Sequence, residues 1–456
     1  MNKNMSDTLP VICENAGRTI EVAMGTTLLE VERQLRLDGP HPFLAAYVNN
    51  RIKELNYRIY KPVTVRFIDI TSFEGIRVYQ RTISFILQKA VRELFPDRTL
   101  YIRHSLGASG FYCEISGFGP IPAEHLDAIK ARMRGIIDRN LPIQGVKMLT
   151  DTARKIYEGF GMADKIALLD SRPRLYSKIY TIDSLPGYFY GALTPSTGYT
   201  PQFDLHPYYN GFFIALPLRT DPTRLQQSVH QEKMFDVFHQ YQSWVEIMGV
   251  PTVGQLNSKV LAGDASELIK IAEAFHENKL AQVAGCVAEA NRERGVRLVL
   301  ISGPSSSGKT TFAKRLGVQL RVLGLNPVLI SLDDYFVDRE KTPRDEKGEY
   351  DYEALEAIDL EQFNDHLKRL ERGESVDIPR YPPVARQPLA ARRAVGTDRR
   401  RHPRTEPGPD ARRSRIPEIQ DLRFLLHLGG PRQRVAHRHL RQPAAAPPDA
   451  RLPHPG

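Results

Sequence analysis

Three different spacings of hydrophobic and polar positions follow one another along the chain. In residues 11–70, short apolar bursts alternate with polar positions and turn signals; residues 27–35 have helical spacing, and residues 63–68 form a closing apolar strand. Residues 222–292 repeat apolar side chains at helical spacing. Residues 296–301 and 328–331 are short continuous apolar runs, as expected of buried parallel strands. The pattern predicts several domains: a β-rich start, a helical middle and an α/β region after it.

The positions of the cysteines and the hydropathy pattern indicate the cellular compartment of the protein. The three cysteines lie at positions 13, 113 and 286, too far apart for a disulfide framework or a metal knuckle. The chain has no run of 18 apolar residues, and its first seven residues lack the apolar core of a secretory signal. These features predict a soluble, cytoplasmic protein.

The formal net charge of +10 is confined to one segment. Residues 382–456 contain 16 Arg, no Lys and six acidic residues, so they carry the whole excess. Residues 1–381 hold 47 basic and 47 acidic residues. The body of the protein therefore gives no electrostatic indication of nucleic-acid binding.

A phosphate-binding motif follows the first apolar run. Residues 303–310 match G-x-x-x-x-G-K-[ST] at every position, with Gly303 and Gly308 as the glycines. Their backbone N–H groups and the following helix N-terminus would hold the phosphates of ATP. Lys309 would reach the β- and γ-phosphates, and the Thr310 hydroxyl would bind Mg²⁺. The expected nucleotide-binding residues are Gly303, Pro304, Ser305, Ser306, Ser307, Gly308, Lys309, Thr310 and Thr311.

The second apolar run ends in Asp333 and Asp334, at the strand edge where α/β sheets bind ligands. A carboxylate beside an alcohol can accept its proton during phosphoryl transfer, although a strand-end helix cap would explain the pair as well. No guanine-reading N-K-x-D follows the loop, which argues against a GTPase. Residues 332–336, Leu-Asp-Asp-Tyr-Phe, resemble the D-S-F-Y segment of uridine kinases and phosphoribulokinases. The resemblance implies that Asp333 is the catalytic base, beside Lys309 as the second catalytic residue, with Asp334 as the alternate base.

This resemblance runs from Arg297 to Tyr381. Residues 350–359 are similar to the nucleoside-contacting F-D-H-P-x-A-x-D segment, with Tyr352 and Glu353 in place of the usual His and Pro. Asp351 would then bind ribose hydroxyls, although a solvated carboxylate explains it equally well. Residues 377–381 resemble the strand before the family's lid. The substrate-binding residues implied are Asp334, Tyr335, Asp351 and Tyr381.

The first 225 residues resemble a different family. Their strand–strand–helix–strand–strand order is that of a β-grasp, and residues 17–28 and 45–50 are similar to the TGS domain of threonyl-tRNA synthetases. Residues 86–97, 110–112 and 195–198 resemble landmarks of the synthetase editing domain. No synthetase catalytic core follows.

The positions that correspond to metal ligands in that editing domain carry other residues. Arg81 and Phe85 stand where two histidines are expected, and Phe189 and Leu193 stand where a Cys and a His are expected. Phe and Leu have no lone pair to offer a metal. The resemblance therefore implies a scaffold kept as a binding or regulatory module, without editing chemistry.

After Tyr381 the kinase resemblance stops. Residues 382–456 contain 13 Pro and no Lys or Tyr, which predicts a disordered segment. Abundant Arg, Pro, Ala and His are what a GC-rich gene yields out of frame, so we expect a frameshift near codon 381. The alternative is an evolved basic tail that binds RNA or DNA.

Together these observations predict five segments: a TGS-like β-grasp domain (1–72), an editing-like α+β domain without metal ligands (73–225), a helical connector (226–292), the first part of an α/β P-loop kinase with a truncated parallel sheet (293–381), and the tail (382–456). The expected function is ATP- and Mg²⁺-dependent phosphorylation of a nucleoside hydroxyl, impaired where the second half of the kinase is lost. The alternatives are a nucleotide-sensing RNA-binding regulator and a kinase of a small sugar phosphate. The expected partners are ATP and a nucleoside-type small molecule, with no membrane.

Overall fold

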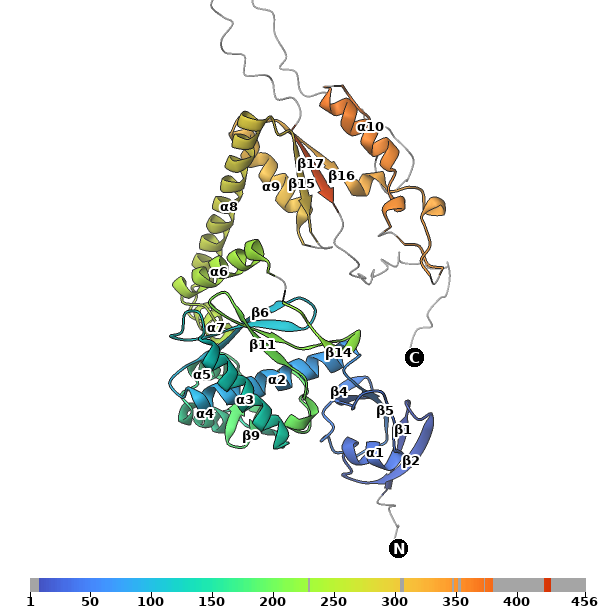
Figure 1. The fold of residues 1–456 in the computed structure, drawn as a ribbon, viewed down its shortest axis with the longest axis vertical. Helices are drawn as coiled ribbons and strands as arrows, with labels where there is room; N and C mark the ends of the chain where they lie inside the picture. Colours follow the sequence, from blue (N-terminus) through green and yellow to red (C-terminus); the bar gives the residue numbers. More distant parts are fainter. Residues whose placement is uncertain are drawn as a thin grey trace, which may run out of the picture. The chain divides into compact units, whose positions relative to one another are not determined.

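The chain divides into two compact units, residues 1–266 and 267–456, in the computed structural model. The structure describes residues 8–228, 230–303, 307–346, 348–351, 354–372, 374–379 and 422–427. Within these residues, no helix is both long enough and apolar enough to cross a membrane. Figure 1 shows the elements coloured along the sequence.

The first unit opens with a five-stranded sheet in the order β2-β1-β5-β3-β4. Its elements are β1 (Thr8–Cys13), β2 (Arg18–Ala23), α1 (Leu28–Leu35), β3 (Ala45–Val48), β4 (Arg51–Lys53) and β5 (Val63–Ile68). The first and last strands pair in parallel at the centre, and both hairpins are antiparallel. Thr27 caps α1 through a reciprocal bond with Glu30, which fixes where the helix begins. The strand and helix order predicted for residues 11–70 is confirmed.

Two further sheets share one core with the long helix α2 (Phe73–Leu94). The first, β11-β12-β7-β6, comprises β6 (Leu100–Leu106), β7 (Gly110–Ile115), β11 (Asp204–Tyr208) and β12 (Gly211–Ala215). The second, β10-β9-β8, comprises β8 (Ile143–Leu149), β9 (Tyr176–Ile182) and β10 (Leu185–Gly187). The remaining elements are α3 (Ala123–Asp138), α4 (Thr150–Gly159), α5 (Ala163–Asp170), η1 (Thr197–Tyr199), β13 (Pro217–Leu218) and β14 (Asp221–Leu225). Most of the editing-like stretch at residues 86–97 thus lies in the second half of a helix that begins at Phe73 and ends at Leu94.

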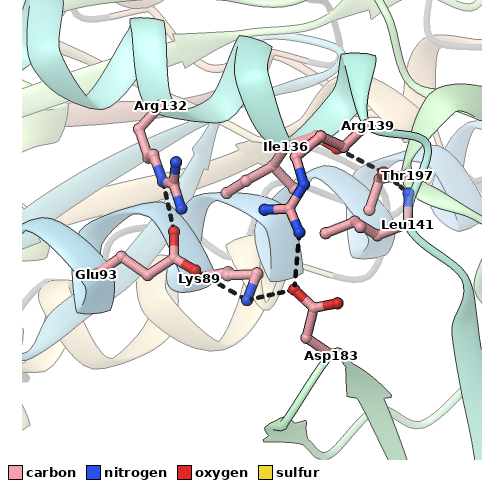
Figure 2. A network of polar contacts seen from close by, with 8 residues as sticks. All are labelled: Lys89, Glu93, Arg132, Ile136, Arg139, Leu141, Asp183 and Thr197. Atoms are coloured by element: carbon pink, nitrogen blue, oxygen red, sulfur yellow. Dashed lines mark hydrogen bonds and ion pairs between the residues drawn. The ribbon is translucent and has the colours of Figure 1, made fainter.

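A buried cation ties α2 to α3 and to the β9–β10 turn (Figure 2). The Lys89 ammonium lies 2.9 Å from Glu93 and 3.1 Å from Asp183. Arg132 of α3 extends the network to Glu93 at 2.5 Å, and Arg139 lies 3.9 Å from Asp183. Because Lys89 is almost fully buried, these carboxylates offset the cost of removing its charge from water.

Helices follow this sheet region. They are α6 (Glu232–Ile247), α7 (Val253–Leu261) and α8 (Ala265–Arg294). The helical spacing predicted for residues 222–292 is confirmed in these helices, and the chain breaks after α6 at Gly249, which has a φ of +68°. Helix α7 occupies the stretch between α6 and α8.

The second unit is built around a parallel three-stranded sheet in the order β15-β17-β16. Its elements are β15 (Leu298–Ser302), α9 (Lys309–Val322), β16 (Pro327–Ser331), η2 (Leu332–Tyr335), η3 (Arg339–Lys341), η4 (Leu355–Ala357), α10 (Leu360–Glu371) and β17 (Leu422–His427). Helix α9 packs on β15 together with α8, around Ile301, Leu316 and Leu280. Helix α10 packs on the β16 side, around Ile330 and Phe363 (Figure 1).

Strand β17 corrects the expectation that the sheet stops after two strands and that residues 382–456 are disordered throughout. Leu422–His427 pairs in parallel with β15 on one side and with β16 on the other. The expectation failed because it rested on the average composition of the segment, whereas these six residues, Leu-Arg-Phe-Leu-Leu-His, contain no proline.

A proline in β17 tests its place at the centre of the sheet. Leu425→Pro removes an N–H from the ladder and leaves a carbonyl unpaired, so it should destabilise the sheet by more than about 2 kcal/mol. Amide hydrogen exchange of residues 298–302 and 327–331 should then become fast, while Leu425→Val keeps the protection of the parent chain. Equal protection in all three proteins would show that β17 does not hold the sheet together.

Candidate active site

The phosphate-binding loop joins β15 to α9. Gly308 precedes the first helical residue and has a φ of +83°, in the left-handed region that a residue with a Cβ rarely adopts. Helix α9 therefore begins at Lys309, with its first N–H groups directed back toward the loop. This start explains why the motif requires glycine at position 308.

The loop closes tightly on itself. The Lys309 ammonium donates a 2.8 Å hydrogen bond to the Gly303 carbonyl at the other end of the loop. A Cβ added to Gly303 would lie 2.8 Å from the Ser307 hydroxyl, so only glycine fits there without a shift. The Lys309 ammonium, the Ser307 hydroxyl and the Gly303 backbone thus lie close together, and all three are groups of the kind that contact phosphate in this motif.

The remaining motif residues are placed as follows. Ser307, Thr310 and Thr311 are exposed at the start of α9, where their hydroxyls are accessible to a ligand. Pro304, Ser305 and Ser306 lie outside the described residues.

Asp333 and Asp334 lie at the same sheet edge as the loop. Ser302, the last residue of β15, pairs with His427 of β17, and Ser331, the last of β16, pairs with the adjacent Leu426. The carboxyl ends of β15 and β16 are therefore level to within one residue, about 10 Å apart across one intervening strand. Asp333 is exposed in η2, directly after that edge, and Asp334 is half-buried.

Tyr335, the last residue of η2, is buried, and its expected role in substrate binding stays a prediction. Its side chain is 1% exposed and packs edge-on against Phe363 of α10. Its hydroxyl lies 3.0 Å from Nδ1 of His366, which is itself buried. Burial raises the pKa of Tyr335 and lowers the pKa of His366, so both stay neutral and can share this hydrogen bond at neutral pH. These contacts favour a packing role for Tyr335.

The last two expected substrate-binding residues are Asp351 and Tyr381. Asp351 is half-buried in a loop, and its N–H donates to the Pro343 carbonyl at 2.8 Å beside the Arg344–Tyr350 bridge. Tyr381, like Tyr352 and Glu353 of the same predicted segment, lies outside the described residues.

In the first unit, the four positions that correspond to metal ligands in the editing domain do come together. Phe85 of α2 packs against Phe189 with ring centroids 5.1 Å apart. Arg81, one turn earlier on α2, donates through Nε to the Ala192 carbonyl at 3.0 Å, and Leu193 follows, buried. Aromatic rings and a guanidinium thus fill this place, groups that do not bind metal cations.

The comparisons with known proteins agree with this two-part organisation. Residues 298–395 match the model of the Phosphoribulokinase / Uridine kinase family. The match confirms the family resemblance of the P-loop unit and extends it past residue 381, where the sequence analysis found it to stop. The second unit thus contains a kinase-family domain.

The N-terminal region is similar to threonine–tRNA ligases. The ligase of Clostridium kluyveri (strain NBRC 12016) is 28% identical over 157 residues, which are 34% of this chain and 24% of the ligase. The ligase of Symbiobacterium thermophilum is 29% identical over 190 residues, 41% of this chain and 29% of the ligase. The chain therefore spans about a quarter of the length of the curated relatives it matches.

Removing the Tyr335 hydroxyl separates a packing role from substrate binding. Tyr335→Phe leaves the buried His366 nitrogen without its partner and should lower the free energy of unfolding by about 1–2 kcal/mol in urea denaturation. Tyr350→Phe, in the Arg344–Tyr350 hairpin, serves as a control and should lower the free energy of unfolding by less. A Tyr335→Phe protein of unchanged stability with a raised KM for the acceptor would instead support the substrate-binding prediction.

Proposed function

We propose that the P-loop unit transfers the γ-phosphoryl group of ATP to a hydroxyl of a nucleoside-type acceptor, most directly the 5′-hydroxyl of uridine or a similar nucleoside. The observation that carries the proposal is the level parallel alignment of β15 and β16, which puts the phosphate loop and Asp333 at one sheet edge. The family match of residues 298–395 supports a phosphotransferase.

In this proposal the loop binds and orients the triphosphate. Its backbone N–H groups and Lys309 contact the phosphate oxygens, and the bond that Lys309 makes to Gly303 is exchanged for one to phosphate. The hydroxyl of Thr310 would hold Mg²⁺, which supplies positive charge against the phosphate oxygens.

Asp333 handles the acceptor. Its carboxylate accepts the proton of the hydroxyl as the acceptor oxygen bonds to the γ-phosphorus and the bond to the β-phosphate oxygen breaks. ADP leaves with that electron pair, and the proton stays on the Asp333 carboxyl until solvent removes it. Asp334, next along the same turn, is the alternate base. Asp351 would bind the ribose hydroxyls; a small sugar phosphate is the alternative acceptor for the same arrangement.

The similarity to threonine–tRNA ligases favours a second candidate, an RNA-binding regulator in which the P-loop senses nucleotide. The equal numbers of basic and acidic residues in residues 1–381 weigh against it, because RNA binding depends on excess positive charge. Tight, salt-sensitive tRNA binding without nucleoside-dependent ADP release would favour this second function.

Paired substitutions test the residue roles. Lys309→Met should abolish ATP binding, measured by calorimetry. Asp333→Asn should keep ATP binding yet lower nucleoside-dependent ADP release roughly 10²–10⁴-fold, since it removes the base and not the phosphate contacts.

Asp365→Asn is the matched control, because Asp365 is an exposed aspartate on α10. Its loss should change neither ATP binding nor nucleoside-dependent ADP release. Full activity in Asp333→Asn with loss in Asp334→Asn would transfer the role of base to Asp334. ADP release that does not depend on any nucleoside would contradict the proposal as a whole.

The composition of the tail supports a change of reading frame near codon 381 as the origin of its Arg- and Pro-rich sequence, whereas the family match, which runs to residue 395, weighs against a change so early. Sequencing the gene across codons 370–400, with the intact mass of its product, tests this. A product at 51.7 kDa from an unaltered frame would refute the frameshift.

A further inference from the structure

A cleft of about 640 Å³ lies within the first unit, remote in sequence from the P-loop. One wall is the end of β4 and the following turn, residues 52–57. The other is formed by β8, β9 and residues 189–192. Its volume suits a small organic ligand.

Glu54 and Lys178 join the two walls. The Lys178 ammonium lies 2.6 Å from a Glu54 oxygen that also accepts a hydrogen bond from the Tyr180 hydroxyl. This contact neutralises the cleft's one carboxylate. Lys53, half-buried on the same wall, has no carboxylate within 4.0 Å among the described residues and rests 5.0 Å from the centre of the Tyr57 ring. The cleft therefore keeps an excess positive charge.

A second cation, Arg81, lies behind the opposite wall; it does not itself line the cleft, but it contacts Gly191, which does. Its guanidinium contacts Gly191 so closely that a Cβ there would lie 2.7 Å from the guanidinium carbon. Among the described residues, only one of its five N–H groups has an acceptor: Nε–H donates to the Ala192 carbonyl. No carboxylate of the described residues lies within 4.0 Å of the guanidinium. Burial lowers the pKa of Arg81, because removing its charge from water costs free energy. A bound anion would offset that cost.

The rest of the cleft suits a planar ring. Tyr57, Tyr180 and Phe189 present aromatic surfaces, and Phe189 is held in place by its contact with Phe85. The exposed amides of Asn56 and Gln144 can each donate and accept hydrogen bonds at a ring edge. Aromatic faces, amides and uncompensated cations match one ligand that combines a heterocycle with an anionic group.

We propose that this cleft binds a free nucleoside 5′-monophosphate, with Arg81 and Lys53 at the phosphate and the aromatic side chains at the base. The site is separate from the P-loop and does not depend on the proposed kinase activity. One of the two groups that would bind the phosphate, Arg81, stands at a position where the resemblance to the editing domain implies a histidine.

The test uses the full chain carrying Lys309→Met, so that any binding measured is not at the P-loop. Isothermal titration with UMP and AMP should show binding of at least one of them, and uridine or adenosine alone should bind at least tenfold more weakly. Orotate, a planar carboxylate without phosphate, separates recognition of phosphate from recognition of any anion; it should also bind at least tenfold more weakly.

Adding Arg81→Met should weaken nucleotide binding at least tenfold. The matched control is Arg77→Met, which removes the same charge one turn earlier on α2 from an exposed side chain and should leave the affinity unchanged. If circular dichroism shows that Arg81→Met does not fold, Lys53→Met on the other wall is used in its place and should weaken nucleotide binding.

Three results would overturn the proposal. They are the absence of nucleotide binding at millimolar concentration, equal affinity for UMP and uridine, and an affinity that neither Arg81→Met nor Lys53→Met changes. Binding of tRNA that UMP fails to displace would also count against it, because the cleft would then be an RNA site.

Discussion

The parallel pairing of β15 and β16 through β17 is the constraint on which the candidate active site depends. A phosphate loop binds nucleotide by itself, but transfer requires a second group at a fixed distance from the γ-phosphate. Because parallel strands end at one edge, the register of β17 decides whether the turn after β16 comes level with the loop. The two helices that cover the sheet, α9 and α10, each hold one of these strands through a separate small core.

The first unit is organised around a long helix rather than around a parallel sheet. Its long helix α2 is held by the buried Lys89 network on one side and carries Arg81 and Phe85 on its middle turns. The scaffold that resembles a synthetase editing region thus keeps its packing, and the residues at its centre belong to the site that we propose for an anion. In this proposal the two units carry a polar recognition site and a phosphate-binding site in one polypeptide.

Local motifs made part of this organisation predictable. The loop from Gly303 to Thr310 could be recognised because its backbone geometry requires glycine at fixed positions, and Gly308 has the positive φ that the motif implies. The strands and helix of residues 11–70 were predictable because alternation and turn residues occur within a few positions of one another.

Other features depend on contacts that a sequence pattern does not contain. Tyr335 follows two aspartates in a family-like segment, yet its direction is set by Phe363 and His366, about 30 residues later. The composition of the segment did not predict strand β17, because the residues on either side of it are rich in proline and arginine. The cleft at Glu54 forms only when Lys178, 124 residues away, folds against it. Whether Asp333 acts as a base likewise depends on the approach of a substrate rather than on its sequence neighbours.

The most direct test of the central claim is to follow the γ-phosphoryl group itself. The full chain is incubated with γ-labelled ATP, Mg²⁺ and individual nucleosides, and the products are separated. The account predicts that label appears in a nucleoside 5′-monophosphate and that its appearance requires the nucleoside's 5′-hydroxyl. Label that remains in ATP, or appears only as inorganic phosphate whatever nucleoside is present, would contradict it.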